Sequence, residues 1–231
     1  MNRIVLMIRK NPIFFLGFTV MLFAGAIFLL IDGKSYSFIL LNSYHVGWLN
    51  SFFISYTFVG NGLFAICLAA VYFLLIKKKK EAFLIFNSFL LSGIIVQVMK
   101  HLFFSPRPKL FFGSGHHSFF IDGIQFYCNN SFPSGHTTTA FAMATVLVLL
   151  SKDKKVQLPV LIGAVLVGYS RIYLGQHFLL DVLMGASIGV ISGIWCVHFS
   201  QRYNFTGRSF RQLFTLKSQS SVTSPGSIQR A

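Results

Sequence analysis

Residues 177–199 read HFLLDVLMGASIGVISGIWCVHF, and this stretch decides what kind of fold the chain can adopt. It is long and apolar enough to cross a bilayer as one helix, which takes about 20 residues. It nevertheless carries His177 and Asp181, four positions apart, and such side chains share one face of a helix. The same row continues through Gly185, Gly189 and Gly193. A row of small residues lets a second helix approach closely, so we expect His177 and Asp181 to face protein rather than lipid.

The whole chain has the composition of a membrane protein. Hydrophobic residues make up 54% of the 231 residues and charged residues only 11%, against about 25% charged residues in an ordinary soluble domain. The formal net charge is +15, but the basic residues stand in short clusters between apolar runs. This layout predicts no nucleic-acid partner, since such a partner needs a basic face. The three scattered cysteines indicate neither a disulfide framework nor a zinc site.

Six apolar runs are long enough to span a membrane, and they predict an all-α, polytopic membrane protein with six transmembrane helices. Their approximate limits are 12–32, 51–76, 82–103, 135–151, 156–173 and 177–199. The first run exceeds the roughly 7–15 apolar residues of a signal peptide, so we expect a retained anchor. We expect one six-helix domain over residues 1–200 and a flexible, basic cytoplasmic tail over 201–231.

The distribution of lysine and arginine predicts the orientation, because these residues accumulate on the cytoplasmic side of short loops. Placing the N-terminus in the cytoplasm puts the clusters at 77–80, 152–155 and 202–217 on that side as well. We therefore expect both termini in the cytoplasm. The outer side keeps Lys34, Lys100, Arg107, Lys109 and Arg171. The long outer loop at 104–134 is rich in phenylalanine, which is typical either of an opening for a lipid head group or of a passive interfacial belt.

Three polar segments lie at the outer ends of the predicted third to sixth helices, so this topology brings them to one membrane face. The first is KHLFFSPRP at residues 100–108, where Lys100 ends a helix and Pro108 biases Arg107 toward an extended backbone. We expect both cations to face one site. Taken alone, the segment is equally compatible with a snorkelling Lys100 and an Arg107 that binds lipid head groups nonspecifically.

The second segment, FPSGHTTTAF at residues 132–141, opens the predicted fourth helix. The free N–H groups of a helix N-terminus attract anions, and here Gly135 allows a phosphate to approach while Ser134 adds a hydroxyl donor. Beside such an anion, His136 is placed to protonate a leaving oxygen. An N-cap with an incidental histidine is the alternative when this segment is taken alone.

The third segment carries Ser170 and Arg171 at the end of the fifth helix and then His177 and Asp181. Asp181 can accept a proton from one ring nitrogen of His177 and leave the other nitrogen free to attack. A purely structural His–Asp pair is the alternative for this segment alone. Two histidines, an aspartate, two arginines and a lysine at one face, however, describe a pocket for a phosphate ester.

A metal site is the rival chemistry for the same residues. His136, His177, Asp181 and the pair His116 and His117 include the ligand types that zinc prefers. The nearby cations oppose a metal, and arginine and lysine can stabilise the charge of phosphoryl transfer without one. We therefore expect no metal and no cofactor.

Together the three segments resemble the signature of the type-2 phosphatidic acid phosphatase superfamily. These are integral-membrane lipid phosphatases related to bacterial acid phosphatases and vanadium haloperoxidases. The signature reads K-x6-RP, then PSGH, then SR-x5-H-x3-D. It is matched here by Lys100, Arg107, Pro108, Pro133, Ser134, Gly135, His136, Ser170, Arg171, His177 and Asp181. The match covers roughly residues 100–181, without a departure inside the motifs.

The resemblance implies a two-step, metal-independent hydrolysis of a lipid phosphate or diphosphate at the outer membrane face. It implies that His177 forms a phosphohistidine, that Asp181 orients His177, and that His136 protonates the departing group and later helps to activate water. The residues implied to hold the phosphoryl oxygens are Lys100, Arg107, Ser134, Gly135 and Arg171.

We expect a bacterial cytoplasmic membrane, with the site facing the periplasm, as the location of such a protein. Undecaprenyl diphosphate, phosphatidylglycerophosphate, phosphatidic acid and a lipid A phosphate all fit a pocket that recognises phosphate and leaves the tail among the membrane lipids. The sequence does not choose among these head groups and does not indicate the oligomeric state. A lipid-linked phosphotransferase of the same architecture is the nearest alternative, and an anion transporter is a more distant one.

Overall fold

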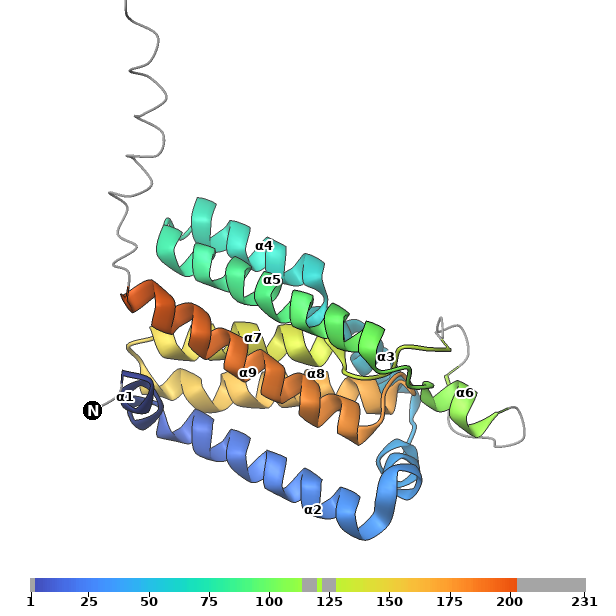
Figure 1. Cartoon of the computed structure of the whole chain (residues 1–231). Coiled ribbons are helices and arrows are strands. Elements are labelled where there is room, and N and C mark those ends of the chain that lie inside the picture. Colours follow the sequence, from blue (N-terminus) through green and yellow to red (C-terminus); the bar gives the residue numbers. More distant parts are fainter. Residues whose placement is uncertain (1–2, 114–119, 122–127, 203–231) are drawn as a thin grey trace, which may run out of the picture.

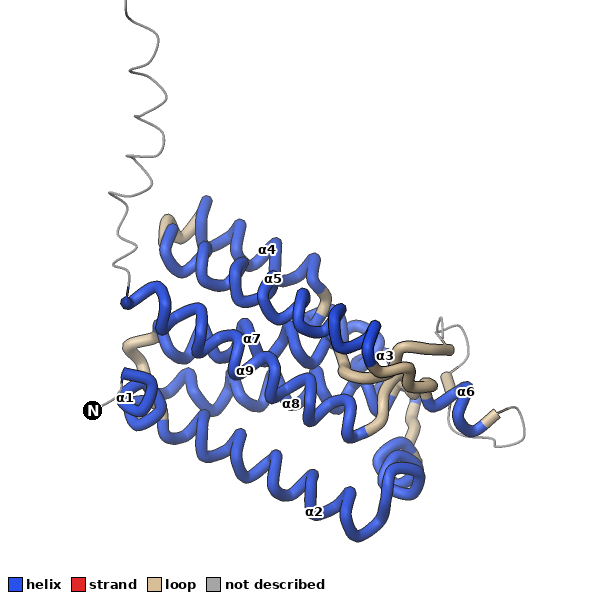
Figure 2. The backbone as a smooth tube through the Cα atoms, in the orientation of Figure 1, coloured by secondary structure: helices blue, strands red, loops and turns tan. Residues whose placement is uncertain are grey.

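All regular secondary structure in the described part of the chain is helical, as the prediction of an all-α fold requires (Figures 1 and 2). The computed structural model describes residues 3–113, 120–121 and 128–202, and within these ranges no residue lies in a β-strand. The elements in chain order are α1 (Arg3–Lys10), α2 (Pro12–Asn42), α3 (Gly47–Tyr56), the 3-10 helix η1 (Thr57–Gly60), α4 (Gly62–Leu74), α5 (Lys79–Leu102), α6 (Pro108–Phe112), α7 (Gly135–Leu150), the 3-10 helix η2 (Lys154–Val156), α8 (Gln157–Tyr173) and α9 (Leu179–Arg202).

All six predicted apolar runs contain helix, but they are not six equal spans. Within the described ranges, four segments are long and apolar enough to cross a membrane, namely α2, α5, η2 with α8, and α9. The pair of α3 with η1 and α4 would be a fifth span, bent by 61°. Helix α7 has 16 residues, which gives about 24 Å of length, less than the roughly 30 Å of a hydrocarbon core. The six-span topology and the cytoplasmic termini therefore stay predictions.

Helix α9 packs against α7 through the predicted row of glycines. A Cβ atom added to Gly185 would lie 2.6 Å from the backbone oxygen of Ser134, and one added to Gly189 would lie 2.5 Å from that of Thr138. At Gly193 the nearest atom would be the Cβ of Thr145, at 2.7 Å. Real Cβ contacts are not this short, so only glycine permits the approach. The expectation that this face of α9 meets protein is confirmed.

Gly189→Ala is expected to destabilise the protein by about 1–3 kcal/mol, because the new methyl group must push α7 and α9 apart. Gly93→Ala on α5 is the matched control, since an added Cβ there meets no atom within 4 Å and alanine favours helix. Thermal unfolding of both variants in detergent measures the difference. Equal melting temperatures for the two would contradict this packing.

Helix α2 is fixed to the bundle at its two ends. At its start, Oε1 of Gln157 accepts hydrogen bonds from the backbone N–H groups of Ile13 and Phe14, at 3.1 and 3.3 Å. At its other end, Nδ2 of Asn42 donates to the backbone oxygens of Ile172 and Tyr173. Between these ties an apolar cavity of about 460 Å³ separates α2 from α8 and α9. The hydrogen bonds of Asn42 hold the end of α8, which carries Arg171 of the candidate site.

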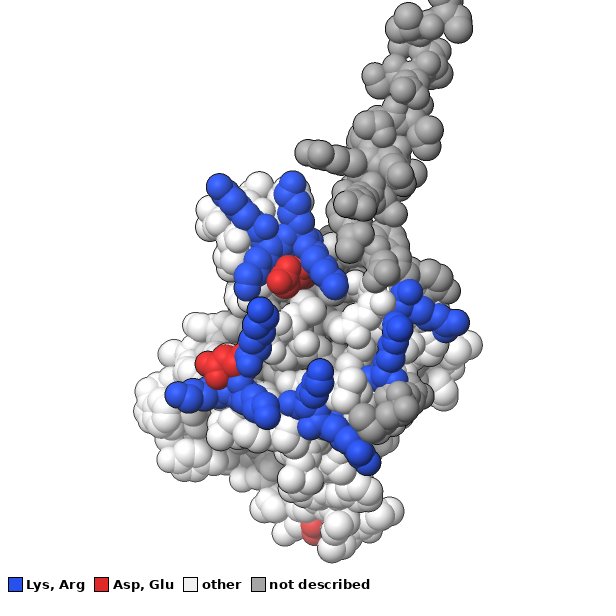
Figure 3. All heavy atoms as spheres, turned by 90° about the vertical axis from the view of Figure 1, so that its left-hand side faces the viewer, with Lys and Arg blue, Asp and Glu red and all other residues white. Residues whose placement is uncertain are grey.

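Lysine and arginine gather at one end of the bundle, at the left of Figure 1 and facing the viewer in Figure 3. This end of the bundle contains α1, the turn between α4 and α5, the 3-10 helix η2 and the end of α9. The loops after α5 and α8 and the start of α7 lie at the opposite end. The bundle thus has a basic end and a separate end for the three polar segments. The predicted tail at 201–231 lies outside the described residues, apart from Gln201 and Arg202, with which α9 ends.

Candidate active site

His177 lies in the tight turn between α8 and α9, and not on a helix as predicted, because α9 begins only at Leu179. Gly175, with a φ of 65°, reverses the chain, and the backbone N–H of His177 donates to the oxygen of Arg171 at 3.1 Å. Asp181 is the third residue of α9, and its carboxylate accepts the backbone N–H of Phe178, the residue before the helix, at 2.9 Å, as in a capping box. The turn therefore fixes His177 directly beside Arg171.

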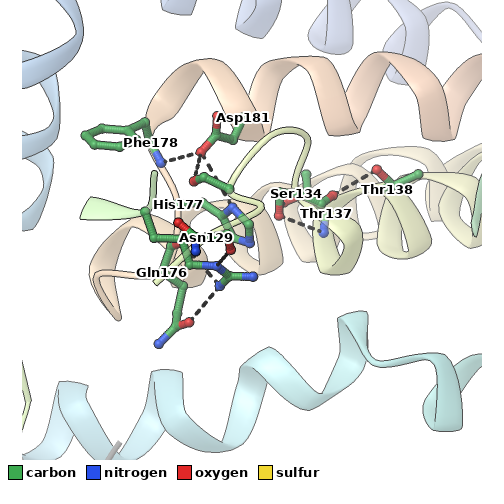
Figure 4. A network of polar contacts seen from close by, with 10 residues as sticks. Asn129, Ser134, Thr137, Thr138, Gln176, His177, Phe178 and Asp181 are labelled. Atoms are coloured by element: carbon green, nitrogen blue, oxygen red, sulfur yellow. Dashed lines mark hydrogen bonds and ion pairs between the residues drawn. The ribbon is translucent and has the colours of Figure 1, made fainter. Parts of the chain in front are cut away.

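The predicted pairing of His177 with Asp181 is present in spite of this difference (Figure 4). Nδ1 of His177 lies 3.5 Å from Oδ2 of Asp181, which is longer than a well-formed hydrogen bond. The same oxygen accepts the hydroxyl of Ser131 and the N–H of Phe178. The backbone oxygen of Asp181 accepts the N–H of Ser134 at 3.0 Å. Asp181 thus connects the turn before α9 to the segment that starts α7.

His177 is almost fully enclosed, with 2% of its surface exposed. This burial lowers the pKa of His177 to about 4, and the nearby Asp181 carboxylate acts in the opposite direction. The imidazole is therefore neutral at neutral pH. When Nδ1 carries the proton toward Asp181, Nε2 keeps a lone pair, as a nucleophile requires.

The start of α7 has the predicted N-cap. Ser134 is fully buried, and its Oγ accepts the N–H of Thr137 at 3.5 Å and lies 2.9 Å from the hydroxyl of Thr137. A Cβ added to Gly135 would meet only a methyl group of Val96, at 3.9 Å, so the chain leaves open space there. The N-terminus of α7 is therefore accessible at the position where an anion was expected.

His136 connects this helix start to the other two segments. It is half-buried, and its ring interacts electrostatically with Arg171, His177, Lys100 and Arg107. These four residues come from the end of α8, the turn before α9, the end of α5 and the loop that follows α5. Two residues of the first segment and two of the third therefore act on the imidazole of the second, as the predicted convergence of the three segments requires.

The three cations of the site also act on one another. Arg107 and Arg171 are 8% and 7% exposed. Lys100 interacts electrostatically with both arginines and with Asp181, and Arg171 interacts with Arg107. Burying like charges next to each other is unfavourable unless opposite charge compensates for it. An anion bound between these cations would supply that charge.

The arginines are held by groups that the sequence did not reveal. Nε of Arg107 donates to the backbone oxygen of Asn129 at 3.1 Å, and Nη1 donates to Oε1 of Gln176 at 2.9 Å. Nη1 of Arg171 donates to the hydroxyl of Thr57 at 2.7 Å. The backbone of Arg107 is extended, with φ −77° and ψ 162°, as the following proline predicted. Among these partners, only Gln176 stands out in the sequence, because it directly precedes His177.

Some predictions fall on residues that the structure does not describe. His116 and His117 lie outside the described residues, as does most of the middle of the 104–134 loop. The described part of that loop includes the short helix α6, which was not predicted. Within residues 3–113, 120–121 and 128–202, no three His, Cys, Asp or Glu side chains lie close enough to hold a metal ion together.

Comparison with known proteins gives a consistent result. The model of the PAP2 superfamily matches residues 81–205, which include all three segments. The undecaprenyl-diphosphatase of Bacillus subtilis is 29% identical over 159 residues, covering 68% of this chain and 78% of that protein. The lipid A 4'-phosphatase of Porphyromonas gingivalis is 32% identical over 136 residues, covering 56% of this chain and 57% of that protein.

A solved structure is similar over most of the fold. It is the crystal structure of a transmembrane PAP2-type phosphatidylglycerolphosphate phosphatase from Bacillus subtilis, which is 25% identical with a TM-score of 0.59. The similarity covers 83% of this chain and 96% of that one. The family match extends over more than half of the chain and contains every residue of the three converging segments, so this protein belongs to the PAP2 superfamily.

Proposed function

We propose that this protein is an integral-membrane lipid phosphatase that removes a phosphate from a lipid monophosphate or diphosphate through a phosphohistidine at His177. The observation that carries the proposal is the group of Lys100, Arg107, Arg171 and His177 around His136. The related proteins named above are phosphatases of lipid phosphates or diphosphates, which supports the same substrate class. No cofactor is needed for the reaction.

In the first step, Nε2 of His177 attacks phosphorus and the bond from phosphorus to the leaving oxygen breaks. Asp181 stabilises the imidazolium charge that develops and keeps the proton on Nδ1. His136, protonated in the complex with the anionic substrate, donates its proton to the leaving oxygen, which departs as the lipid alcohol or the lipid monophosphate. The products of this step are the phosphohistidine and a protonated leaving group.

In the second step, water attacks phosphorus while His136 accepts a proton from it, and the bond between phosphorus and Nε2 breaks. Inorganic phosphate leaves, and both histidines return to their starting protonation states. Lys100, Arg107 and Arg171 stabilise the equatorial oxygens in both steps, and the N-terminus of α7 at Ser134 and Gly135 adds backbone donors. If another lipid or a sugar replaced water here, the same site would be a phosphotransferase.

The proposal predicts phosphate release from detergent-solubilised lipid phosphates in the presence of a chelator. The panel contains undecaprenyl diphosphate, phosphatidylglycerophosphate, phosphatidic acid and a lipid A phosphate, and product analysis follows both phosphate and any newly phosphorylated acceptor. We expect activity on at least one lipid and unchanged rates with chelator. Loss of activity on chelation would contradict the metal-independent mechanism, and a phosphorylated acceptor without free phosphate would identify the transferase.

We also propose that the site opens to the periplasmic face of a bacterial cytoplasmic membrane, with residues 1–200 as the catalytic domain. Cys128 tests the orientation, because it is exposed and its backbone oxygen accepts the N–H of Arg107, a residue of the site. In a variant without Cys67 and Cys196, we expect a membrane-impermeant maleimide to label Cys128 in intact spheroplasts. A Lys78→Cys variant that lacks Cys128 is the matched control for the basic end. Labelling of that variant before permeabilisation, with Cys128 protected, would reverse the orientation.

A further inference from the structure

The second apolar stretch is broken where it reaches the active site. Helices α3 and α4 are joined by η1 and bent by 61°. Oδ1 of Asn61 accepts the N–H of Leu63 at 2.9 Å and so caps the restarted helix. A Cβ added to Gly60 would lie 2.7 Å from the backbone oxygen of His136 and 2.6 Å from a methyl carbon of Val167. The break is therefore pressed against the start of α7 and against α8.

This contact brings Thr57 to the phosphate-binding group. Nη1 of Arg171 donates to Oγ1 of Thr57 at 2.7 Å, across 114 positions of sequence. Thr57 is half-buried at the first position of η1. It lies outside the family match at residues 81–205 and outside all three predicted segments. If residues 57–62 formed a straight helix, the chain would not bend at Gly60 and pack against His136. The contact of Thr57 with Arg171 therefore depends on the break between α3 and α4.

The hydroxyl of Thr57 is a neutral acceptor for a buried cation. Arg171 is 7% exposed, and no carboxylate among the described residues lies within ion-pair distance of it. Its Nε is buried and has no hydrogen-bond partner in that part of the chain. A carboxylate in the place of Thr57 would cancel the charge of Arg171, whereas a hydroxyl fixes one N–H and leaves the charge for an incoming anion. The unpaired Nε is a donor that a phosphoryl oxygen can satisfy.

We infer that Thr57 is a positioning residue of the active site: its hydroxyl fixes the guanidinium of Arg171 so that the remaining N–H groups face the phosphoryl group. The inference rests on the proposed function of Arg171 as a phosphate ligand. It extends the site to the first half of the chain and gives the break between α3 and α4 a role in catalysis.

Thr57→Val, which keeps the shape of the side chain and removes the acceptor, is expected to lower kcat/KM about 10- to 100-fold, the range for losing one hydrogen bond to a charged group. Inhibition by orthovanadate, a phosphate analogue, is expected to weaken by a similar factor. Thr57→Ser keeps the hydroxyl and is expected to stay within about threefold of the unmodified protein. Thr145→Val is the matched control, because its hydroxyl is buried and bonded within α7 to the oxygen of Phe141.

The outcomes separate this inference from the proposed function. A loss in Thr57→Val that Thr57→Ser restores, with melting temperatures like that of Thr145→Val, supports the positioning role. An unaffected Thr57→Val, or a Thr57→Ser as impaired as Thr57→Val, overturns it. If Thr57→Val does not fold, Thr57→Ala replaces it in the same comparison with the same criteria. Full activity in Arg171→Ala would instead overturn the assignment of Arg171 in the proposed function.

Discussion

His177→Ala is expected to lower phosphate release by about 1,000-fold or more, because the substitution removes the nitrogen that forms the covalent intermediate in the proposed mechanism. The histidine is enclosed, neutral and held by the backbone of Arg171, so its removal takes away the attacking atom without removing the cations. Binding of orthovanadate is expected to persist, although more weakly. The measurement is phosphate release at saturating lipid substrate, together with a melting curve.

His198→Ala is the matched control for this variant. His198 lies near the other end of α9, and the 19 positions from Leu179, where α9 begins, to His198 correspond to about 28 Å of helix. We expect its activity to equal that of the unmodified protein. A His177→Ala variant that kept a tenth of the activity would exclude a phosphohistidine at this residue.

Asp181→Asn is expected to lower kcat by about 100- to 1,000-fold while KM changes little. An amide cannot stabilise the imidazolium as a carboxylate does, and its NH2 group favours the wrong tautomer of the histidine. Oδ2 of Asp181 lies 3.5 Å from Nδ1 of His177, so the substitution acts directly on the nucleophile. The pH dependence of kcat is expected to change as well, because the imidazole loses its charged partner.

Ser131→Ala distinguishes the effect of the Asp181 carboxylate on catalysis from its effect on the structure of the turn before α9. The serine hydroxyl donates to the same Oδ2, but the carboxylate and its charge remain when the hydroxyl is removed. We expect a loss of about tenfold in kcat, the lower end of the range for one hydrogen bond to a charged group, because the charge of the carboxylate remains. Equal losses in Ser131→Ala and Asp181→Asn would mean that Asp181 acts only by holding the turn before α9.

The helices and the three segments could be predicted because they depend on local properties of the chain. Apolar length marks α5, α8 and α9, and the glycine row on α9 marks its contact with α7 because an added Cβ has no room there. The residue types of the candidate site are unusual in an apolar chain, so the amino-acid sequence alone makes them stand out.

The remaining features depend on contacts between distant parts of the chain. The position of His177 before α9 follows from the reversal at Gly175 and the capping by Asp181, which helical spacing does not show. The backbone oxygen of Asn129 leaves no mark in the sequence, since every residue has one. Thr57 lies within a run that reads as one continuous apolar span. Its role becomes visible only when η1 is seen against α7 and α8.

The most direct test is to trap the intermediate by acid-free rapid quench during turnover of a lipid phosphate labelled at phosphorus, and to locate the label by peptide mass spectrometry. The mechanism predicts one acid-labile, base-stable phosphohistidine, in the peptide that contains His177. It also predicts no label in His177→Ala and a longer-lived label in His136→Ala, since His136 activates the water of the second step. A label on another residue, or turnover without any phosphorylated protein, would contradict the account.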